Sequence, residues 1–188
     1  MSGKLIAFEG LDGTGKTTQI QILEKRLRDR GIPCMSTREP RFFRSLILNH
    51  NFDPAVDLLL FGADRALHVD RVIRPALEQG LVVLCDRYAA STIAYQCFGH
   101  GLPIQHCLAL NKIACRGIYP SLSIWLDFQH AHKSGDRFEQ QSSDFFRRVH
   151  NGYRYLEFRN PKFIRVIAGD IEVTANAIAQ IVDAKLMG

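Results

Sequence analysis

Long hydrophobic runs are missing from this sequence. Its 188 residues contain no stretch near the ~18 apolar residues that a membrane-spanning helix needs, and the longest apolar runs are Leu58–Phe61 and Leu81–Cys85. The apolar stretch before Glu9 is also too short for a secretory signal peptide. These two absences predict a cytoplasmic protein that does not act at a membrane.

Cysteine pairs with the spacing of a metal site are missing as well. The number of cysteines is odd, no two of them form a C-x-x-C pair, and most lie in apolar stretches; they are Cys34, Cys85, Cys97, Cys107 and Cys115. This pattern predicts buried, reduced thiols and argues against a zinc site. Repeats and low-complexity linkers are absent too, so we expect a single domain over residues 1–188.

Acidic residues are outnumbered by basic ones, which gives a net charge of +5, with 17 arginines against 7 lysines. A guanidinium group matches two oxygens of a phosphate or carboxylate at once, so the excess of arginine indicates anionic ligands. Surface solvation explains the same excess equally well. A role in nucleic-acid binding would rest on this charge alone, because no motif combines aromatic and basic residues as a single-strand site does. We therefore predict no nucleic-acid partner.

Five short apolar runs predict buried strands, and they are mostly continuous, as in a sheet that is covered on both faces. They are Leu5–Phe8, Cys34–Thr37, Leu81–Cys85, Leu122–Leu126 and Phe163–Ile167. Helical patterns cover Thr18–Arg30, Ala55–Gln79 (with a break near Pro75), Ile104–Arg116, Ser143–Phe158 and Asp170–Met187. This alternation predicts an α/β fold with helices on both faces of a five-stranded parallel sheet. Ligands of such folds bind beyond the carboxyl ends of the strands.

A glycine-rich segment follows the first predicted strand and opens the first predicted helix. It fits the phosphate-binding pattern G-x-x-x-x-G-K-[ST] of P-loop proteins. The residues expected to hold ATP are Gly10, Leu11, Asp12, Gly13, Thr14, Gly15, Lys16, Thr17 and Thr18. Glycines let backbone N–H groups point into one concave anion site, and the helix adds its positive end. We expect Lys16 to bridge phosphate oxygens and Thr17 to bind Mg²⁺; the alternative is a glycine-rich turn without a ligand.

A carboxylate is predicted at the metal beside Thr17. The run from Leu81 to Cys85 ends in Asp86, at the edge of the sheet where an acidic partner for Mg²⁺ or its waters is expected. Asp86 could instead only pair with Arg87.

Several blocks in one order resemble bacterial thymidylate kinases, from residue 5 to about residue 158. They are Phe8–Gln19, Thr37–Pro40, Leu58–Ala66, Val72–Leu77, Asp86–Tyr88, Ser91–Thr92, Ala94–Gln96, Asp136–Glu139 and Asp144–Phe146. The resemblance implies a nucleoside monophosphate kinase-like P-loop fold and the transfer of the γ-phosphoryl group of MgATP to dTMP. It also implies a homodimer, for which Ala55–Gln79 and Ile104–Arg116 offer apolar faces.

The resemblance also assigns an acceptor site. Its members would be Glu39, Arg44, Phe61, Arg65, Arg87, Ser91, Tyr95 and Gln96. Phe61 resembles the ring that stacks on thymine, Arg65 the donor to a thymine carbonyl, and Arg44 and Arg87 the arginines that hold the dTMP phosphate. Asp12 and Glu39 resemble acidic groups near the sugar and phosphate of the acceptor. Ser91 and Gln96 resemble contacts to the base, and Tyr95 resembles a ring against the sugar.

Each of these acceptor residues also has a plainer interpretation. Phe61 would be an ordinary core residue, Arg44 and Arg87 would be partners in ion pairs, and the segment from Ser91 to Gln96 would be a helix face that packs on the core.

Two loops depart from the family pattern. Arg44 follows Pro40 after only three residues, so the acceptor loop is short, and the lid is reduced to about residues 128–142. Lid arginines supply transition-state charge in family members whose P-loop lacks an arginine, as this one does. Arg137 is the expected catalytic lid residue beside Lys16, Asp12 and Arg87; Lys133, Arg147 and Arg148 are the other candidates. These departures leave two alternatives open: a kinase for another nucleoside monophosphate, and a nucleotide-binding relative with weak catalysis.

Overall fold

The computed structural model describes residues 3–128 and 141–187. Its core is one parallel sheet with the strand order β2-β3-β1-β4-β5. The strands are β1 (Lys4–Glu9), β2 (Cys34–Arg38), β3 (Val82–Asp86), β4 (Leu122–Asp127) and β5 (Phe163–Ile167). Every strand that the apolar runs predict is present, with its ends displaced by at most one residue. The predicted five-stranded parallel α/β fold is therefore confirmed.

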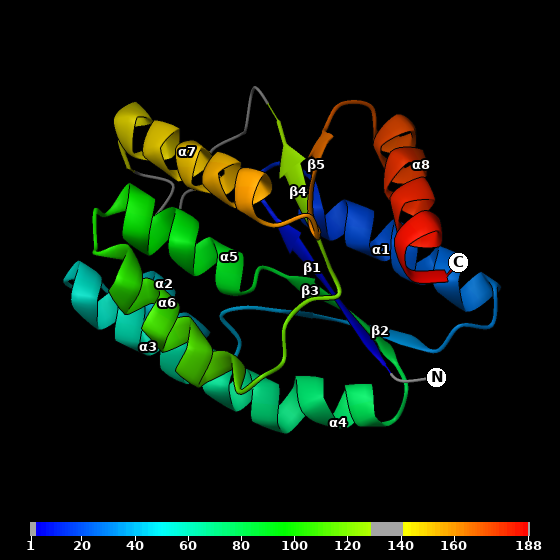
Figure 1. The fold of residues 1–188 in the computed structure, drawn as a ribbon, viewed down its shortest axis with the longest axis horizontal. Helices are drawn as coiled ribbons and strands as arrows, with labels where there is room; N and C mark the ends of the chain where they lie inside the picture. Colours follow the sequence, from blue (N-terminus) through cyan, green and yellow to red (C-terminus); the bar gives the residue numbers. More distant parts are fainter. Residues whose placement is uncertain (1–2, 129–140, 188) are drawn as a thin grey trace.

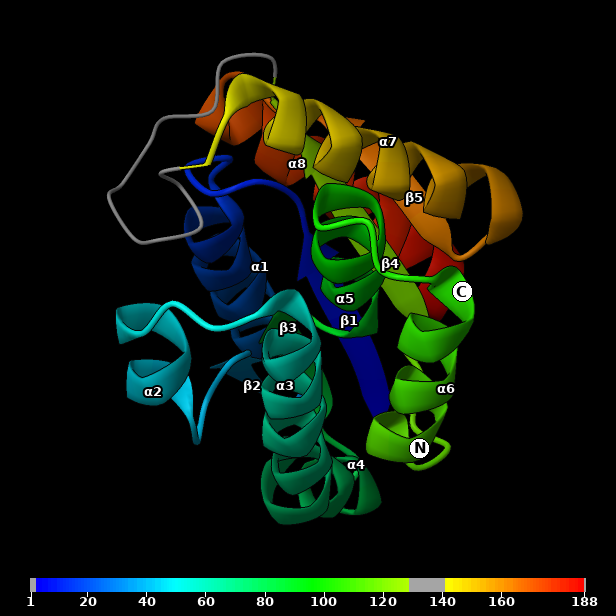
Figure 2. The same cartoon turned by 90° about the vertical axis from the view of Figure 1, so that its left-hand side faces the viewer.

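Helices connect the strands and cover both faces of the sheet (Figure 1). The α-helices are α1 (Lys16–Asp29), α2 (Arg44–Asn49), α3 (Pro54–His68), α4 (Arg74–Glu78), α5 (Ala89–Thr92), α6 (Ile104–Cys115), α7 (Ser143–Arg159) and α8 (Ile171–Val182). Three π-helical segments extend or join them: η1 (Val69–Ile73), η2 (Ile93–Gly99) and η3 (Asp183–Met187). Figure 2 shows α2 beside α3 at the edge of the molecule. Within the described ranges, no helix is long and apolar enough to cross a membrane.

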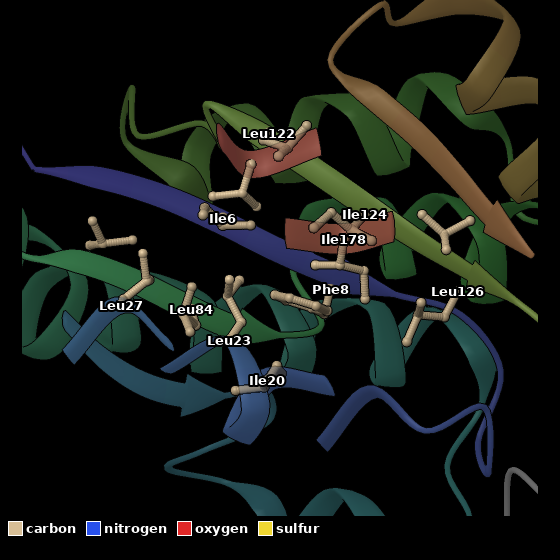
Figure 3. Close-up of a cluster of buried hydrophobic side chains, with 13 residues drawn as sticks. Ile6, Phe8, Ile20, Leu23, Leu27, Leu84, Leu122, Ile124, Leu126 and Ile178 are labelled. Atoms are coloured by element: carbon tan, nitrogen blue, oxygen red, sulfur yellow. The ribbon is translucent and has the colours of Figure 1, made fainter. Parts of the chain in front are cut away.

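The sheet separates two apolar cores, and alternate residues of its central strands point into one or the other. Ile6 and Phe8 of β1 face α1 and α8, where they pack with Leu23 and Ile178 (Figure 3). Leu5 of β1 faces the opposite layer, which includes η1 and α4. Because successive side chains of a strand point to opposite faces, each strand has to be apolar at nearly every position. This explains the continuous runs in the sequence.

The long helical pattern before β3 is not interrupted at Pro75, contrary to the expected break. The chain stays helical from Pro54 to Glu78 and widens to π-helical hydrogen bonding in η1. Pro75 is the second residue of α4, which follows directly on η1, so the change from π-helical to α-helical hydrogen bonding falls at the proline.

Two helical regions lie outside the ranges that the helical patterns cover: the short α2, and the continuous stretch formed by α5 and η2. The second includes the segment from Ser91 to Gln96, for which a helix face packed on the core is the plainer interpretation. This stretch is buried on several sides, as the side chains of Thr92, Ile93, Ala94 and Tyr95 are all buried. A helix buried in this way has no polar face, so its sequence lacks the stripe by which a surface helix is recognised.

Candidate active site

The loop between β1 and α1 turns sharply at three glycines with positive φ: Gly10 (138°), Gly13 (75°) and Gly15 (86°). A Cβ atom on Gly10 would lie 2.4 Å from the carbonyl oxygen of Leu126, so the close approach of this loop to β4 requires glycine. Gly15 is the N-cap of α1 and brings the loop to the positive end of that helix. The result is a concave backbone site suited to an anion.

Lys16 folds back over this loop and is buried. Its Nζ donates to the carbonyl oxygens of Gly10 (3.2 Å) and Leu11 (2.7 Å) and lies 3.8 Å from Oδ1 of Asp12. Burial, followed by the nearby Arg87 guanidinium, lowers the pKa of Lys16 to about 8. A phosphate group in the loop would oppose both effects and favour the charged ammonium.

Thr17 and Asp86 meet where α1 begins and β3 ends. The Thr17 hydroxyl donates to Oδ2 of Asp86 at 3.0 Å. Arg87 forms its ion pair with Asp12, so the alternative in which Asp86 serves only Arg87 finds no support. Hydroxyl and carboxylate oxygens are hard donors, and Mg²⁺ is bound in proteins by one or two carboxylates together with substrate phosphates and water. The two side chains therefore fit a Mg²⁺ ion shared with a bound nucleotide.

A pocket of about 590 Å³, including its open mouth, lies beside the phosphate loop. All eight predicted acceptor residues line it: Glu39, Arg44, Phe61, Arg65, Arg87, Ser91, Tyr95 and Gln96. Asp12 lines it too, as do three residues to which the sequence assigned no role: Pro40, Leu48 and Thr92. A second hollow of about 820 Å³ contains Lys16 and Thr17 and shares Asp12, Glu39, Arg44 and Arg87 with the first. The two spaces are thus neighbours with a common wall.

Arg65 is fixed at the base of the first pocket and is only 2% exposed. Its Nε donates to Oε2 of Glu39 (2.8 Å), and its Nη1 donates to Thr92 (2.9 Å) and Asn111 (2.7 Å). The other oxygen of Glu39 lies 3.1 Å from Nδ1 of His68. Burial acts to lower the pKa of Arg65, but the Glu39 carboxylate outweighs it and raises that pKa. The guanidinium is therefore charged and held in one orientation.

Arg87 joins several polar side chains in the shared wall. Its Nη2 donates to Oδ1 of Asp12 (2.7 Å) and to the Tyr95 hydroxyl (3.1 Å), and its Nη1 donates to Ser91 (3.2 Å) and Tyr153 (3.4 Å). Its backbone has a φ of 70°, a conformation that few residues other than glycine adopt. Burial opposes the charge, but the Asp12 carboxylate raises the pKa of Arg87 well above its usual value. A permanent cation thus faces both spaces.

Phe61 is half-buried, packs against the core beneath α7 and also lines the pocket. The two interpretations of this ring, stacking surface and core residue, are both compatible with its position. Ser91 donates to Oε2 of Glu9 at 2.6 Å, so its proton is already engaged. Its expected contact with the base stays a prediction.

Glu9 is a fully buried carboxyl group at the end of β1 that the sequence did not single out. It accepts hydrogen bonds from the backbone N–H of Tyr88 (3.0 Å), from Ser91 (2.6 Å) and from Tyr153 (3.4 Å). Burial raises its pKa from an ordinary value of 4.5 to about 7, against the opposing effect of these hydrogen bonds and of Arg87. The group therefore changes charge near neutral pH.

This shift makes folding stability depend on pH. Between pH 4.5 and 7 the unfolded chain ionises Glu9 while the folded protein keeps it protonated, so the free energy of unfolding falls as the pH rises. Relative to Glu9→Gln, which cannot titrate, we expect the wild type to lose about 3 kcal/mol from pH 4 to pH 8. Denaturant unfolding at several pH values measures this difference. Parallel curves for the two proteins would contradict the expectation.

The catalytic lid residue predicted from the sequence, Arg137, lies outside the described residues, as does Lys133. The other two candidates have different partners: Arg147 pairs with Asp144 at 3.1 Å, and Arg148 donates to the carbonyl oxygen of Gly99. Among the described residues, the arginines that line the space around Lys16 are Arg38, Arg44 and Arg87. Arg38 is one that the sequence reasoning missed, although it ends β2 next to Glu39 at the edge of the sheet where the other ligands were expected.

A glycine-rich loop at the end of β1, a hydrogen-bonded Thr–Asp pair beside it and an adjoining pocket with fixed arginines are features of a P-loop phosphotransferase. Residues 8–178 match the family model for thymidylate kinase. A thymidylate kinase from Pelotomaculum thermopropionicum is 42% identical over an alignment 185 positions long. The alignment covers 89% of this chain and 86% of that protein.

Another thymidylate kinase, from a Synechococcus species, is 43% identical over an alignment 176 positions long. The alignment covers 87% of this chain and 85% of that protein. A crystal structure of thymidylate kinase from Ehrlichia chaffeensis superposes with a TM-score of 0.82 and 26% identity, covering 97% of this chain and all of that one. The chain belongs to the thymidylate kinase family.

Proposed function

We propose that this protein transfers the γ-phosphoryl group of MgATP to dTMP and releases dTDP and ADP. One observation carries the proposal. The pocket lined by all eight predicted acceptor residues shares a wall with the phosphate loop, so an acceptor phosphate and a donor phosphate would meet at Arg87. A reaction between two bound nucleotides needs this proximity above all.

The donor side acts by binding charge. Backbone N–H groups of the loop and the ammonium of Lys16 would hold the phosphate oxygens of ATP, with Lys16 exchanging the carbonyls of Gly10 and Leu11 for those oxygens. Thr17 and Asp86 would hold Mg²⁺, which neutralises negative charge on the phosphates when it is bound. Arg38, Arg44 and Arg87 surround the same space and add positive charge.

The acceptor side orients dTMP. Phe61 offers a face for the thymine ring, Arg65 offers a rigid donor to a thymine carbonyl, and Arg44 and Arg87 offer donors to the phosphate. Tyr95 packs over Arg87, with 4.9 Å from the guanidinium carbon to the ring centre, and would lie against the sugar. An oxygen of the acceptor phosphate then attacks the γ-phosphorus, a new P–O bond forms, and the bond to the β-phosphate oxygen breaks. The nucleophile belongs to the substrate, so positioning and charge are what the protein supplies.

The choice of acceptor can be measured directly. We expect dTMP to be among the best substrates in a coupled ADP-release assay that compares dTMP, dUMP, dCMP, dGMP and AMP with MgATP. The reason is that Arg65, fixed by Glu39, presents a donor, which suits the carbonyl of thymine and opposes the amino group of cytosine. A clear preference for another monophosphate would indicate the first alternative, a different nucleoside monophosphate kinase. ATP binding without turnover would indicate the second.

We infer that the protein pairs with a second copy of itself. Exposed apolar side chains lie on α3 and α6, whose helices contact each other: Leu59 (63% exposed), Leu108 (53%) and Ile113 (72%). Exposed apolar side chains on neighbouring helices favour association. Sedimentation at micromolar concentration measures this, and a 21.3 kDa species alone would refute it. The cytoplasmic location expected from the sequence stays a prediction.

A further inference from the structure

The shortened acceptor loop is held to α3 by one buried carboxylate. Asp64, only 1% exposed, accepts the backbone N–H of Arg41 on Oδ2 (2.7 Å) and the backbone N–H of Phe43 on Oδ1 (2.6 Å). Each oxygen thus takes one short, charge-assisted hydrogen bond from the same loop. Two bonds of this kind, two residues apart, fix the path of the backbone between Pro40 and α2.

These contacts also prepare the start of α2. Phe43 is the N-cap residue of α2, and its own side chain cannot accept a hydrogen bond there. Asp64 supplies an acceptor to Phe43 from another helix. The next residue is Arg44, which begins α2 and lines both the acceptor pocket and the space around Lys16. The position of Arg44 therefore depends on the loop that Asp64 holds.

Asp64 also differs from its neighbours in what it touches. Arg65, the next residue in α3, lines the acceptor pocket itself, while no atom of Asp64 is among the groups that form either space. Its two hydrogen bonds go to backbone N–H groups rather than to a side chain of the Glu39 network. One turn of α3 thus serves the pocket in two ways, directly through Arg65 and indirectly through Asp64.

We propose that Asp64 is a positioning residue for the acceptor phosphate: by holding the short loop, it places Arg44 where that phosphate binds. The proposal rests on the function proposed above. The proposal distinguishes Asp64 from the residues that recognise the base, because loss of Asp64 would weaken only the contacts to the phosphate of dTMP.

Asp64→Asn tests this, since the amide replaces one acceptor oxygen by an NH₂ group that faces another N–H donor. We expect the KM for dTMP to rise about tenfold and the KM for ATP to rise by less, because Arg44 also lines the space around Lys16. Thymidine, which has the same base and sugar but no phosphate, serves as a competitive inhibitor. Its inhibition constant is expected to stay within twofold of the wild-type value.

Two further variants complete the test. In an Arg44→Ala background, Asp64→Asn is expected to add little, because the group through which it acts is already gone. Ile178→Val, in the core on the far side of the sheet, serves as the control for a general loss of stability. It is expected to lower the melting temperature without changing the KM for dTMP.

Three results would overturn the proposal: an unchanged KM for dTMP, an equal loss of affinity for dTMP and thymidine, or additive effects with Arg44→Ala. If Asp64→Asn does not fold, Asp64→Glu, which keeps the charge but displaces the carboxylate, is measured in the same way. Failure of both to fold would assign Asp64 to folding alone. Absence of dTMP phosphorylation by the wild type would instead refute the proposed function, whatever the variants do.

Discussion

Lys16→Ala is expected to reduce phosphoryl transfer at least a hundredfold while the protein stays folded. Among the described residues, Lys16 is the one lysine that lines the space at the phosphate loop, and its loss removes charge where the donor phosphates would bind. A hundredfold loss corresponds to about 2.7 kcal/mol of transition-state stabilisation. We expect the variant to stay folded, because burying the ammonium is itself unfavourable, as the lowered pKa of Lys16 (about 8) indicates. Steady-state turnover with dTMP and MgATP measures the first effect, and thermal unfolding measures the second.

Lys25→Ala is the matched control for this variant. Lys25 lies on the same helix, α1, but is exposed and pairs with Asp29 on the surface. We expect its removal to leave turnover unchanged, because surface ion pairs contribute little. Full activity of Lys16→Ala would refute the assignment of the loop as the ATP site.

Arg87→Lys is expected to lower kcat/KM for dTMP by roughly a hundredfold, although the charge is kept. A lysine has no planar fork, so it cannot serve Asp12, Tyr95 and Ser91 together and still face a phosphate. Most of the loss is expected in the KM for dTMP, because Arg87 lines the acceptor pocket. The KM for ATP is expected to rise less.

The control for this variant is Arg147→Lys on α7. Arg147 is exposed, pairs with the exposed Asp144 and lines neither of the two spaces. Its replacement is expected to leave both KM values as they are. Equal kinetic constants for Arg87→Lys and the wild type would show that a point charge is sufficient at this position.

The strands and the phosphate loop could be predicted because their signals are local. A strand buried on both faces is apolar at nearly every position, and the phosphate loop needs glycines and a lysine at fixed intervals. The acceptor residues had no such local signal. They were found through the resemblance to a family, and the structure then brought all eight to one pocket.

The supporting groups could not be predicted, because their contacts join distant parts of the chain. Glu39 and Arg65 are 26 residues apart, and Ser91 and Tyr153 are 62 residues apart. The local sequence around one member of each pair does not indicate the other member. His68 and Asn111 complete the buried network around Arg65, yet each would pass as an ordinary helical residue. The α5–η2 stretch is predicted as helical only as an alternative, because its amino-acid pattern lacks the polar stripe of a surface helix.

Because the two spaces share a wall, the first nucleotide to bind affects the binding of the second. Arg44 and Arg87 line both spaces, so their positive charge attracts whichever nucleotide binds first. The second nucleotide then meets a weaker attraction and a nearby like charge, and its encounter rate falls accordingly. Added salt screens the repulsion between the two nucleotides. The apparent affinity for each substrate is therefore expected to depend less on the presence of the other as ionic strength increases.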